Sequence, residues 1–193
     1  MVKIALFGGT FDPIHTGHLI AAEDIFRILK LDKIIFVPTG VPPHKSCKNI
    51  TQAKHRFAMV KLAIKGNQKF SISNYEIKGK EKAYSIDTVR YFKKRLGSSV
   101  KLYFIIGSDI VRELHAWKDI KKLIKLCNFI VMTRQGFKVP KEEIKKIGKF
   151  IDIQSENISS REIRRLVKKD ESIKYLVPNG VEKYIYEKKL YRE

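Results

Sequence analysis

Short apolar runs alternate with amphipathic stretches along the whole chain, and this pattern predicts alternating strands and helices. The runs predicted as strands are 4–7, 33–37, 70–77, 102–106, 128–132 and 150–153. The stretches with helical spacing are 16–30, 51–65, 85–95, 110–126, 140–147, 159–169 and 178–190. We expect 110–126 to fold in two pieces around Trp117. Strands that alternate with helices predict an α/β fold, a doubly wound parallel sheet with helices on both faces.

The 193 residues fit a single domain, 1–193, in which a helical part from about 155 to 193 packs on the sheet. No internal repeat, low-complexity tract or long linker divides this length. No apolar stretch approaches the roughly 20 residues of a membrane span, so no membrane partner is expected. Cys47 and Cys127 stand in unrelated contexts, which favours a reduced, cytoplasmic protein without a signal peptide.

The formal net charge is +20, from 40 Lys and Arg residues against 20 Asp and Glu residues. This excess is typical of nucleic-acid binding, of steering toward anionic small substrates, or of a compositional habit. The lysines are spread from Lys30 to Lys189 and form no single stripe interleaved with aromatic residues. We therefore favour a general compositional excess of basic residues, with some electrostatic steering of anionic substrates, and we expect no nucleic-acid partner. A nucleic-acid-binding protein on an inactive nucleotide fold stays as the rival hypothesis, and a homo-oligomer stays open.

The segment after the first predicted strand concentrates candidate chemistry. Gly8 and Gly9 allow a ligand to approach the backbone closely, and Thr16 can cap the helix that follows. The free N–H groups of a helix N-terminus bind anions, and His15 and His18 lie at that same end. The chain has no Gly-x-x-x-x-Gly-Lys-Ser/Thr loop and no Gly-x-Gly-x-x-Gly fingerprint. A metal is disfavoured, because the His-x-x-His pair lacks a Glu and a third ligand.

The ends of several predicted strands carry further candidates. In doubly wound sheets, ligands bind outside the carboxyl ends of the strands, where the strand order reverses. The residues expected there are Gly8, Gly9, His15, His18, His44, Lys45, Gly107, Asp109 and Arg134. Trp117 follows one strand end by a short stretch, where it either packs in the core or stacks on a flat heterocycle.

The start of the helix predicted at 159–169 has two interpretations. Ser159 and Glu162 have the spacing of a capping box. The same helix N-terminus can also hold a phosphate group, with Arg164 supplying positive charge.

Several strings resemble known motifs. Gly-Gly-Thr-Phe-Asp-Pro-Ile-His-Thr-Gly-His, ending at His18, resembles the signature of the nucleotidyltransferase superfamily that carries an (H/T)xGH motif. Ile-Ser-Ser-Arg-Glu-Ile-Arg, ending at Arg164, resembles the ISSTxIR motif of that superfamily, with Arg161 where Thr or Ser is usual. With Pro-Pro-His-Lys (42–45), Tyr-Ser-Ile-Asp-Thr (84–88), Gly-Ser-Asp (107–109), Trp117 and Arg134, nearly the whole chain is similar to the bacterial nicotinate-nucleotide adenylyltransferase family.

This resemblance implies a Rossmann-like nucleotidyltransferase fold and two substrates, ATP and nicotinate mononucleotide. It implies that ATP is bound by Gly8, Gly9, Thr10, His15, His18, Gly107, Asp109, Ser159, Ser160 and Arg164. It implies that the mononucleotide is bound by His44, Lys45, Ser85, Trp117 and Arg134. His15, His18 and Arg164 are the implied catalytic residues, and the implied cofactor is Mg²⁺, held through phosphates and without protein ligands.

The expected reaction is adenylyl transfer that forms nicotinate adenine dinucleotide and pyrophosphate in NAD biosynthesis. Pantetheine-phosphate and nicotinamide-nucleotide adenylyltransferases are the alternatives within the same class. Segment 79–83 departs from the family pattern, so the strictness for nicotinate over nicotinamide stays open.

Overall fold

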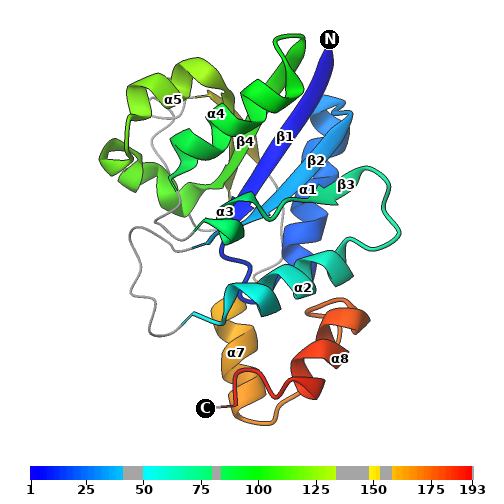
Figure 1. Cartoon of the computed structure of the whole chain (residues 1–193). Helices are drawn as coiled ribbons and strands as arrows, with labels where there is room; N and C mark the ends of the chain where they lie inside the picture. The colour runs from blue at the N-terminus through cyan, green and yellow to red at the C-terminus, as the bar shows by residue number, and fades with distance from the viewer. Residues whose placement is uncertain (41–49, 80–83, 134–147, 153–157, 193) are drawn as a thin grey trace.

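The structure is a computed structural model that describes residues 1–40, 50–79, 84–133, 148–152 and 158–192 (Figure 1). Its strands are β1 (Val2–Gly9), β2 (Lys33–Pro38), β3 (Phe70–Ile72), β4 (Val100–Gly107), β5 (Asn128–Thr133) and β6 (Gly148–Asp152). Its helices are α1 (Thr16–Leu29), α2 (Ala53–Ala63), α3 (Tyr75–Lys78), α4 (Ser85–Leu96), the 3₁₀ helix η2 (Ser108–Ala116), α5 (Ile120–Leu126), α7 (Ser160–Lys168) and α8 (Asn179–Glu187).

The described strands form one sheet of six strands in the order β3-β2-β1-β4-β5-β6, and every neighbouring pair is parallel. The chain winds from β1 outward to β3, then crosses back to β4 and winds outward in the other direction. The order therefore reverses between β1 and β4, where a doubly wound sheet opens a crevice. The predicted fold class is confirmed.

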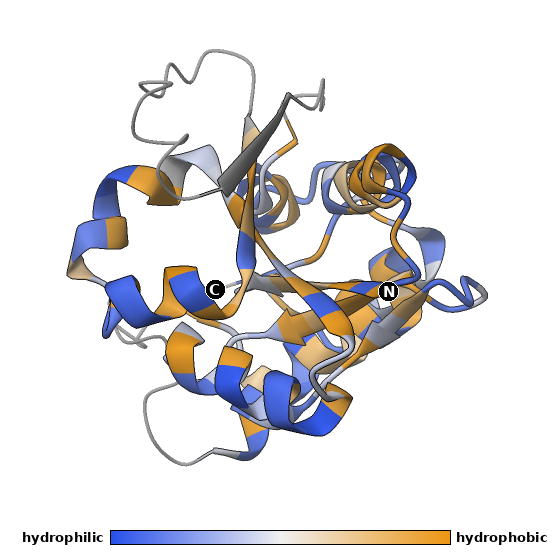
Figure 2. Cartoon of the chain, turned by 90° about the horizontal axis from the view of Figure 1, so that it is seen from above, coloured by the Kyte–Doolittle hydropathy of each residue, from blue (hydrophilic) through white to orange (hydrophobic). Residues whose placement is uncertain are grey.

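Alternate residues of β1 build two apolar cores, one on each face of the sheet. Ala5 and Phe7 belong to the cluster that includes side chains of α1, α2, α7 and α8. Ile4 and Leu6 belong to the cluster formed with α4 and α5. Both cores follow from the period of two in a strand that is covered on both faces. Viewed from above, the largely apolar strands run between the helices of the two layers (Figure 2).

The C-terminal helices share the first of these cores. Ile163 and Val167 of α7 and Val181 and Ile185 of α8 are buried in the same cluster as β1 and α1. The pair α7 and α8 lies beyond the carboxyl end of β1, next to α2 (Figure 1). This packing puts α7 beside the loop that follows β1.

Three sequence predictions need correction. The predicted strand 70–77 is β3 for its first three residues, after which Tyr75–Lys78 form the short helix α3. The first strand does not stop at Gly8, because backbone pairing with Val37 and Pro38 of β2 continues through Gly9. Segment 110–126 does fold in two pieces, but the first is the 3₁₀ helix η2. The helix predicted at 140–147 lies outside the described residues.

In the described parts of the chain, no helix is both long enough and apolar enough to pass through a bilayer.

Candidate active site

Glycines end the two strands that border the crevice. Gly8 and Gly9 close β1, and Gly107 closes the neighbouring β4, which is in register at Phe7 and Ile105. A Cβ atom at Gly9 would lie 2.9 Å from the ring of Phe11, too close for any side chain. The absence of a side chain at Gly9 therefore lets the Phe11 ring pack directly against the end of β1.

His15 and His18 lie together at the start of α1. Their ring centroids are 3.7 Å apart, and His15 is only 2% exposed. The His18 ring is enclosed on its other sides by edge contacts with Phe7 and Phe11, at 6.1 and 5.2 Å between centroids. Aromatic packing thus fixes the orientation of His18 relative to the helix tip.

A hydrogen bond also defines the protonation of the His18 ring. The backbone N–H of His15 donates to Nδ1 of His18 at 3.3 Å. An Nδ1 atom that accepts carries no proton, so the proton of the neutral ring is on Nε2. His18 can then present an N–H donor to an anionic oxygen at the helix N-terminus.

The cap of α1 differs from the prediction. His15, not Thr16, is the N-cap residue, with extended backbone angles. The Thr16 hydroxyl instead donates to the carbonyl oxygen of Leu176 at 2.6 Å, and its N–H donates to the same oxygen at 2.9 Å. Thr16 therefore joins α1 to the C-terminal segment and is not free to cap.

A second helix tip meets the same loop. Ser159 caps α7 by accepting the N–H of Glu162 at 3.1 Å, as the spacing predicts. The Ser160 hydroxyl donates to the carbonyl of Pro13 at 2.8 Å, and Arg164 Nη1 donates to the carbonyl of Asp12 at 2.6 Å. These bonds bring the tip of α7 against the β1–α1 loop, although the bonded residues are 147 and 152 positions apart in sequence.

Gly17 keeps the two helix tips close. A Cβ atom at this position would lie 3.1 Å from Nδ1 of His15 and 3.7 Å from Cβ of Ile158. A side chain here would press on the His15 ring, whereas its contact with Ile158 would be an ordinary one.

Arg56 is a buried residue that hydrogen-bonds the loops around the site, and the sequence analysis did not identify it. It is 2% exposed and donates to three carbonyls, those of Thr51 (2.8 Å), Thr10 (2.8 Å) and Gly40 (3.2 Å). A guanidinium group spans such separated acceptors because its donors form a fixed fork. One signal was available: Arg56 occupies the apolar face of α2 with Met59 and Val60, at spacings of three and four.

Glu76 lies under the same loops. Its carboxylate accepts the Thr88 hydroxyl at 2.7 Å, and the side chain is 8% exposed. Burial raises the pKa of Glu76 to about 7, although hydrogen bonds from Thr88 and the Gly40 backbone and the charge of Arg56 act to lower it.

Ser85 and Trp117 lie on elements that meet on the other side of β4. Ser85 begins α4, and Trp117 follows η2, where its ring meets Phe104 of β4 edge-on at 6.3 Å. Lys118 joins the two elements, with Nζ 4.4 Å from the centre of the Tyr84 ring and 3.7 Å from Asp87. Trp117 is half-buried, so it takes part in the core and keeps exposed ring surface.

The remaining predicted residues are only partly described. Asp109 is within η2. His44, Lys45 and Arg134 lie outside the described residues.

The reversal of strand order at a glycine-lined edge, with two helix tips beside it, defines a nucleotide-binding protein of the doubly wound α/β class. The profile of the cytidylyltransferase-like family matches residues 6–166. Two curated relatives, from Thermoanaerobacter sp. (strain X514) and Clostridium tetani, are 43% and 44% identical over 201 residues. Both are named "Probable nicotinate-nucleotide adenylyltransferase", and the matches cover 100% of this chain and 95% and 100% of theirs.

A solved structure has the same fold over nearly its full length. The nicotinic acid mononucleotide adenylyltransferase of Plasmodium falciparum, complexed with NaAD, matches with a TM-score of 0.84 and 25% identity. The match covers 99% of this chain and 98% of that one. The chain belongs to the cytidylyltransferase-like family, and within it to the nicotinate-nucleotide adenylyltransferases.

Proposed function

We propose that this protein transfers the adenylyl group of ATP to nicotinate mononucleotide, releasing pyrophosphate. The observation that carries the proposal is the contact of the α7 tip with the loop that leads from the glycine end of β1 to the tip of α1. In this proposal, the N–H groups of the two helix tips and the two histidines bind the triphosphate. The relatives of matching length carry the same activity in their names.

The chemistry needs little covalent help from the protein. The phosphate of the mononucleotide is already an anionic nucleophile, so no general base is required. One of its oxygens forms a bond to the α-phosphorus of ATP. The bond between that phosphorus and the oxygen that bridges to the β-phosphate, on the opposite side, breaks. The leaving group is pyrophosphate, and no covalent enzyme intermediate forms. Catalysis then consists of positioning the reactants and stabilising charge.

We assign His18 to the reacting α-phosphate. Its Nε2–H group can donate to a non-bridging oxygen, because Nδ1 is held by the His15 backbone. His15, Ser159, Ser160 and Arg164 are assigned to the phosphates that leave. Gly8, Gly9 and Thr10 give ATP close access to the backbone at the end of β1. Gly107 and Asp109 are assigned to the nucleoside on the β4 side.

The mononucleotide is assigned to the side of β4 where α4 begins. We assign the Ser85 hydroxyl as a hydrogen-bond donor to the pyridine carboxylate, and the half-buried Trp117 ring as the surface on which the pyridine stacks. His44, Lys45 and Arg134 complete this assignment by sequence. The approach from β4 puts the acceptor phosphate on the opposite side of the crevice from the triphosphate end at α7.

Mg²⁺ would enter this site as a companion of the triphosphate, since it prefers phosphate oxygens and water. When bound, it would neutralise the charge that collects on pyrophosphate. Asp12, the buried carboxylate of the β1–α1 loop, accepts hydrogen bonds from Tyr191 and Thr51 on its two oxygens. We therefore assign it no role as a metal ligand.

The test is pyrophosphate release from ATP with three acceptors in turn: nicotinate mononucleotide, nicotinamide mononucleotide and pantetheine phosphate. We expect the highest kcat/KM with nicotinate mononucleotide. Faster turnover of either other acceptor would show that this acceptor, and not nicotinate mononucleotide, is the preferred substrate. No release, with steeply salt-dependent binding to duplex DNA or RNA, would favour the inactive nucleic-acid-binding hypothesis.

A further inference from the structure

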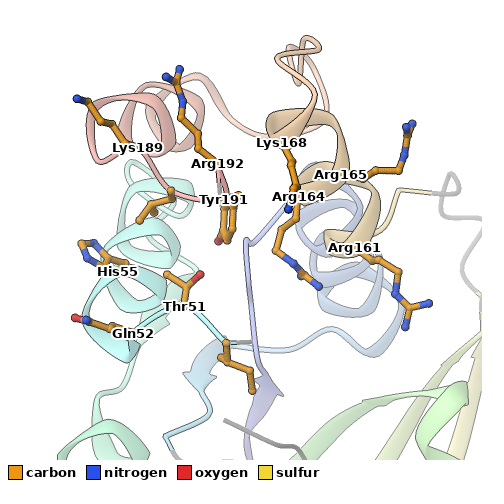
Figure 3. A pocket seen from close by; sticks show the side chains of 12 residues that line it. Thr51, Gln52, His55, Arg161, Arg164, Arg165, Lys168, Lys189, Tyr191 and Arg192 are labelled. Carbon is orange, nitrogen blue, oxygen red and sulfur yellow. The ribbon is translucent and has the colours of Figure 1, made fainter. Parts of the chain in front are cut away.

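A basic cavity of about 950 Å³ lies between α2, α7 and the C-terminal segment (Figure 3). Its basic lining residues are Arg161, Arg164, Arg165, Lys168, Lys189 and Arg192. Of the residues assigned to ATP above, only Arg164 is among them. The cavity therefore adjoins the nucleotide site and is mostly built from other residues.

One face of α7 supplies most of the charge. Arg161, Arg164, Arg165 and Lys168 are spaced at i, i+3, i+4 and i+7, which puts them on one side of the helix. Lys189 and Arg192 line the cavity from the C-terminal segment on the other side, and in Figure 3 their side chains extend along its rim, away from α7. None of the described residues that line the cavity is acidic.

The positive charge is only partly compensated within the protein. Arg165 pairs with Glu162 at 2.6 Å, and Arg192 with Asp170 at 3.8 Å. For Arg161, Lys168 and Lys189, the described parts of the chain provide no ion pair. Like charges this close repel one another, and a bound polyanion would remove that cost.

The lining also restricts the kind of anion. The aromatic rings among the described lining residues are Tyr191, whose hydroxyl is bonded to Asp12, and His55, whose Nδ1 is bonded to the hydroxyl of Tyr184. Recognition of single-stranded nucleic acid uses exposed aromatic faces on which bases stack. With six basic side chains against two rings that are each tied to the protein by a hydrogen bond, the lining favours phosphate groups over stacked bases.

We propose that this cavity is a second anion site that binds a short inorganic oligophosphate, such as triphosphate, while ATP occupies the nucleotide site. Arg161, Lys168, Lys189 and Arg192 contact the oligophosphate. Arg164, which is bonded to the Asp12 carbonyl, forms the boundary between the two sites. The proposal goes beyond the adenylyl transfer and does not depend on its acceptor.

Calorimetric titration with sodium triphosphate, with a non-hydrolysable ATP analogue present at saturation, tests the proposal. We expect binding to persist under these conditions. The triple variant Lys168→Gln, Lys189→Gln and Arg192→Gln should weaken it at least tenfold, since three charges near the anion are lost. A control variant, Lys94→Gln, Arg95→Gln and Lys125→Gln, removes three exposed charges from α4 and α5 and should bind as the parent does.

Three results would overturn the proposal. Loss of triphosphate binding when the analogue is present would make the cavity part of the ATP site. Unchanged binding in the triple variant would place the anion elsewhere, and tighter binding of a single-stranded oligonucleotide than of triphosphate would change the class of ligand. If the triple variant does not fold, the single variants Lys168→Gln and Lys189→Gln must each weaken binding. The readout is heat of binding, so a failure of adenylyl transfer does not affect it.

Discussion

The hydroxyl group of Tyr191 donates a hydrogen bond of 2.8 Å to Oδ1 of Asp12, and so joins the last turn of the chain to the loop after the first strand. The other carboxylate oxygen of Asp12 accepts the N–H of Thr51 at 3.2 Å. Burial, followed by the charge of Asp12, raises the pKa of Tyr191 well above its usual range, so the hydroxyl keeps its proton. The proposed ATP loop is thus held from beneath by the C-terminus.

Replacing this donor should cost stability. Tyr191→Phe leaves a buried carboxylate oxygen without its partner, and we expect a loss of about 1.5–3 kcal/mol in the free energy of unfolding. Urea unfolding followed by circular dichroism measures it. Tyr175→Phe is the control, because that side chain is 77% exposed and should leave stability unchanged. Equal stability of both variants would show that the Tyr191–Asp12 bond contributes nothing net.

Gly17 offers a test of the helix tip that separates activity from stability. Gly17→Ala places a Cβ atom 3.1 Å from the His15 ring, which must shift. Alanine favours the helix, so stability should stay within about 1 kcal/mol while kcat falls roughly tenfold or more. Gly180→Ala is closely matched, since Gly180 is also the second residue of its helix and its Cβ would meet Leu62 at an ordinary 3.9 Å. A fall in kcat for both variants would contradict the interpretation.

His18→Ala should lower kcat by about 10²–10³ and leave folding intact, because the Nε2–H donor to the reacting phosphate is lost. Steady-state pyrophosphate release measures kcat, and thermal unfolding measured in parallel shows whether the variant is folded. His115→Ala removes an exposed imidazole from η2 and should keep kcat. Retained turnover in His18→Ala would remove this residue from the chemistry.

Trp117→Ala should mainly raise KM for nicotinate mononucleotide, by about tenfold, because a stacking surface is lost. A smaller loss of stability is also expected, since the ring packs against Phe104. Trp117→Phe keeps a stacking face and should restore most of the affinity. If stability falls while KM does not change, Trp117 serves the core alone.

The raised pKa of Glu76 predicts a pH dependence of stability. The folded value of about 7 exceeds the value of 4.5 in the unfolded chain, so the folded state holds this proton more tightly. Its contribution is complete below about pH 4.5 and is lost as pH rises through about 7. It amounts to about 3 kcal/mol.

Glu76→Gln keeps the shape of the side chain and removes its titration. Between pH 4.5 and 8, the unfolding free energy of the parent should therefore fall relative to that of the variant. Chemical unfolding at several pH values and fixed ionic strength measures this difference. Glu113→Gln, at an exposed acidic position, should follow the parent curve. Parallel curves for the parent and Glu76→Gln would mean that folding does not raise the pKa of Glu76.

The alternation of apolar runs was enough to predict the parallel sheet, because strands covered on both faces leave a plain signal in sequence. Adjacency across the sheet was harder to predict. The contact of Ser160 with Pro13 joins residues 147 positions apart, and only the resemblance to a family indicated that they belong to one site. Tyr75–Lys78 became α3 because tertiary packing, with Glu76 buried against Thr88, overrides a weak alternation of apolar residues.

Some features had no usable signal in sequence. Thr16 has the composition of a cap, but its hydroxyl is drawn to the Leu176 carbonyl by a segment that periodicity cannot place. The stripe of basic residues on α7 was visible as spacing, yet its importance depends on Lys189 and Arg192 standing opposite. Charge count alone could not distinguish this cavity from a general excess of lysine.

The three carbonyls bound by Arg56 carry an evolutionary consequence. In a chain with 40 basic residues, exchange between lysine and arginine is harmless at most exposed positions. At position 56 it is not, because an ammonium group is a single point and cannot reach acceptors in three separate loops at once. Substitution toward lysine should therefore be tolerated over much of the surface of this protein and barred at this one buried position.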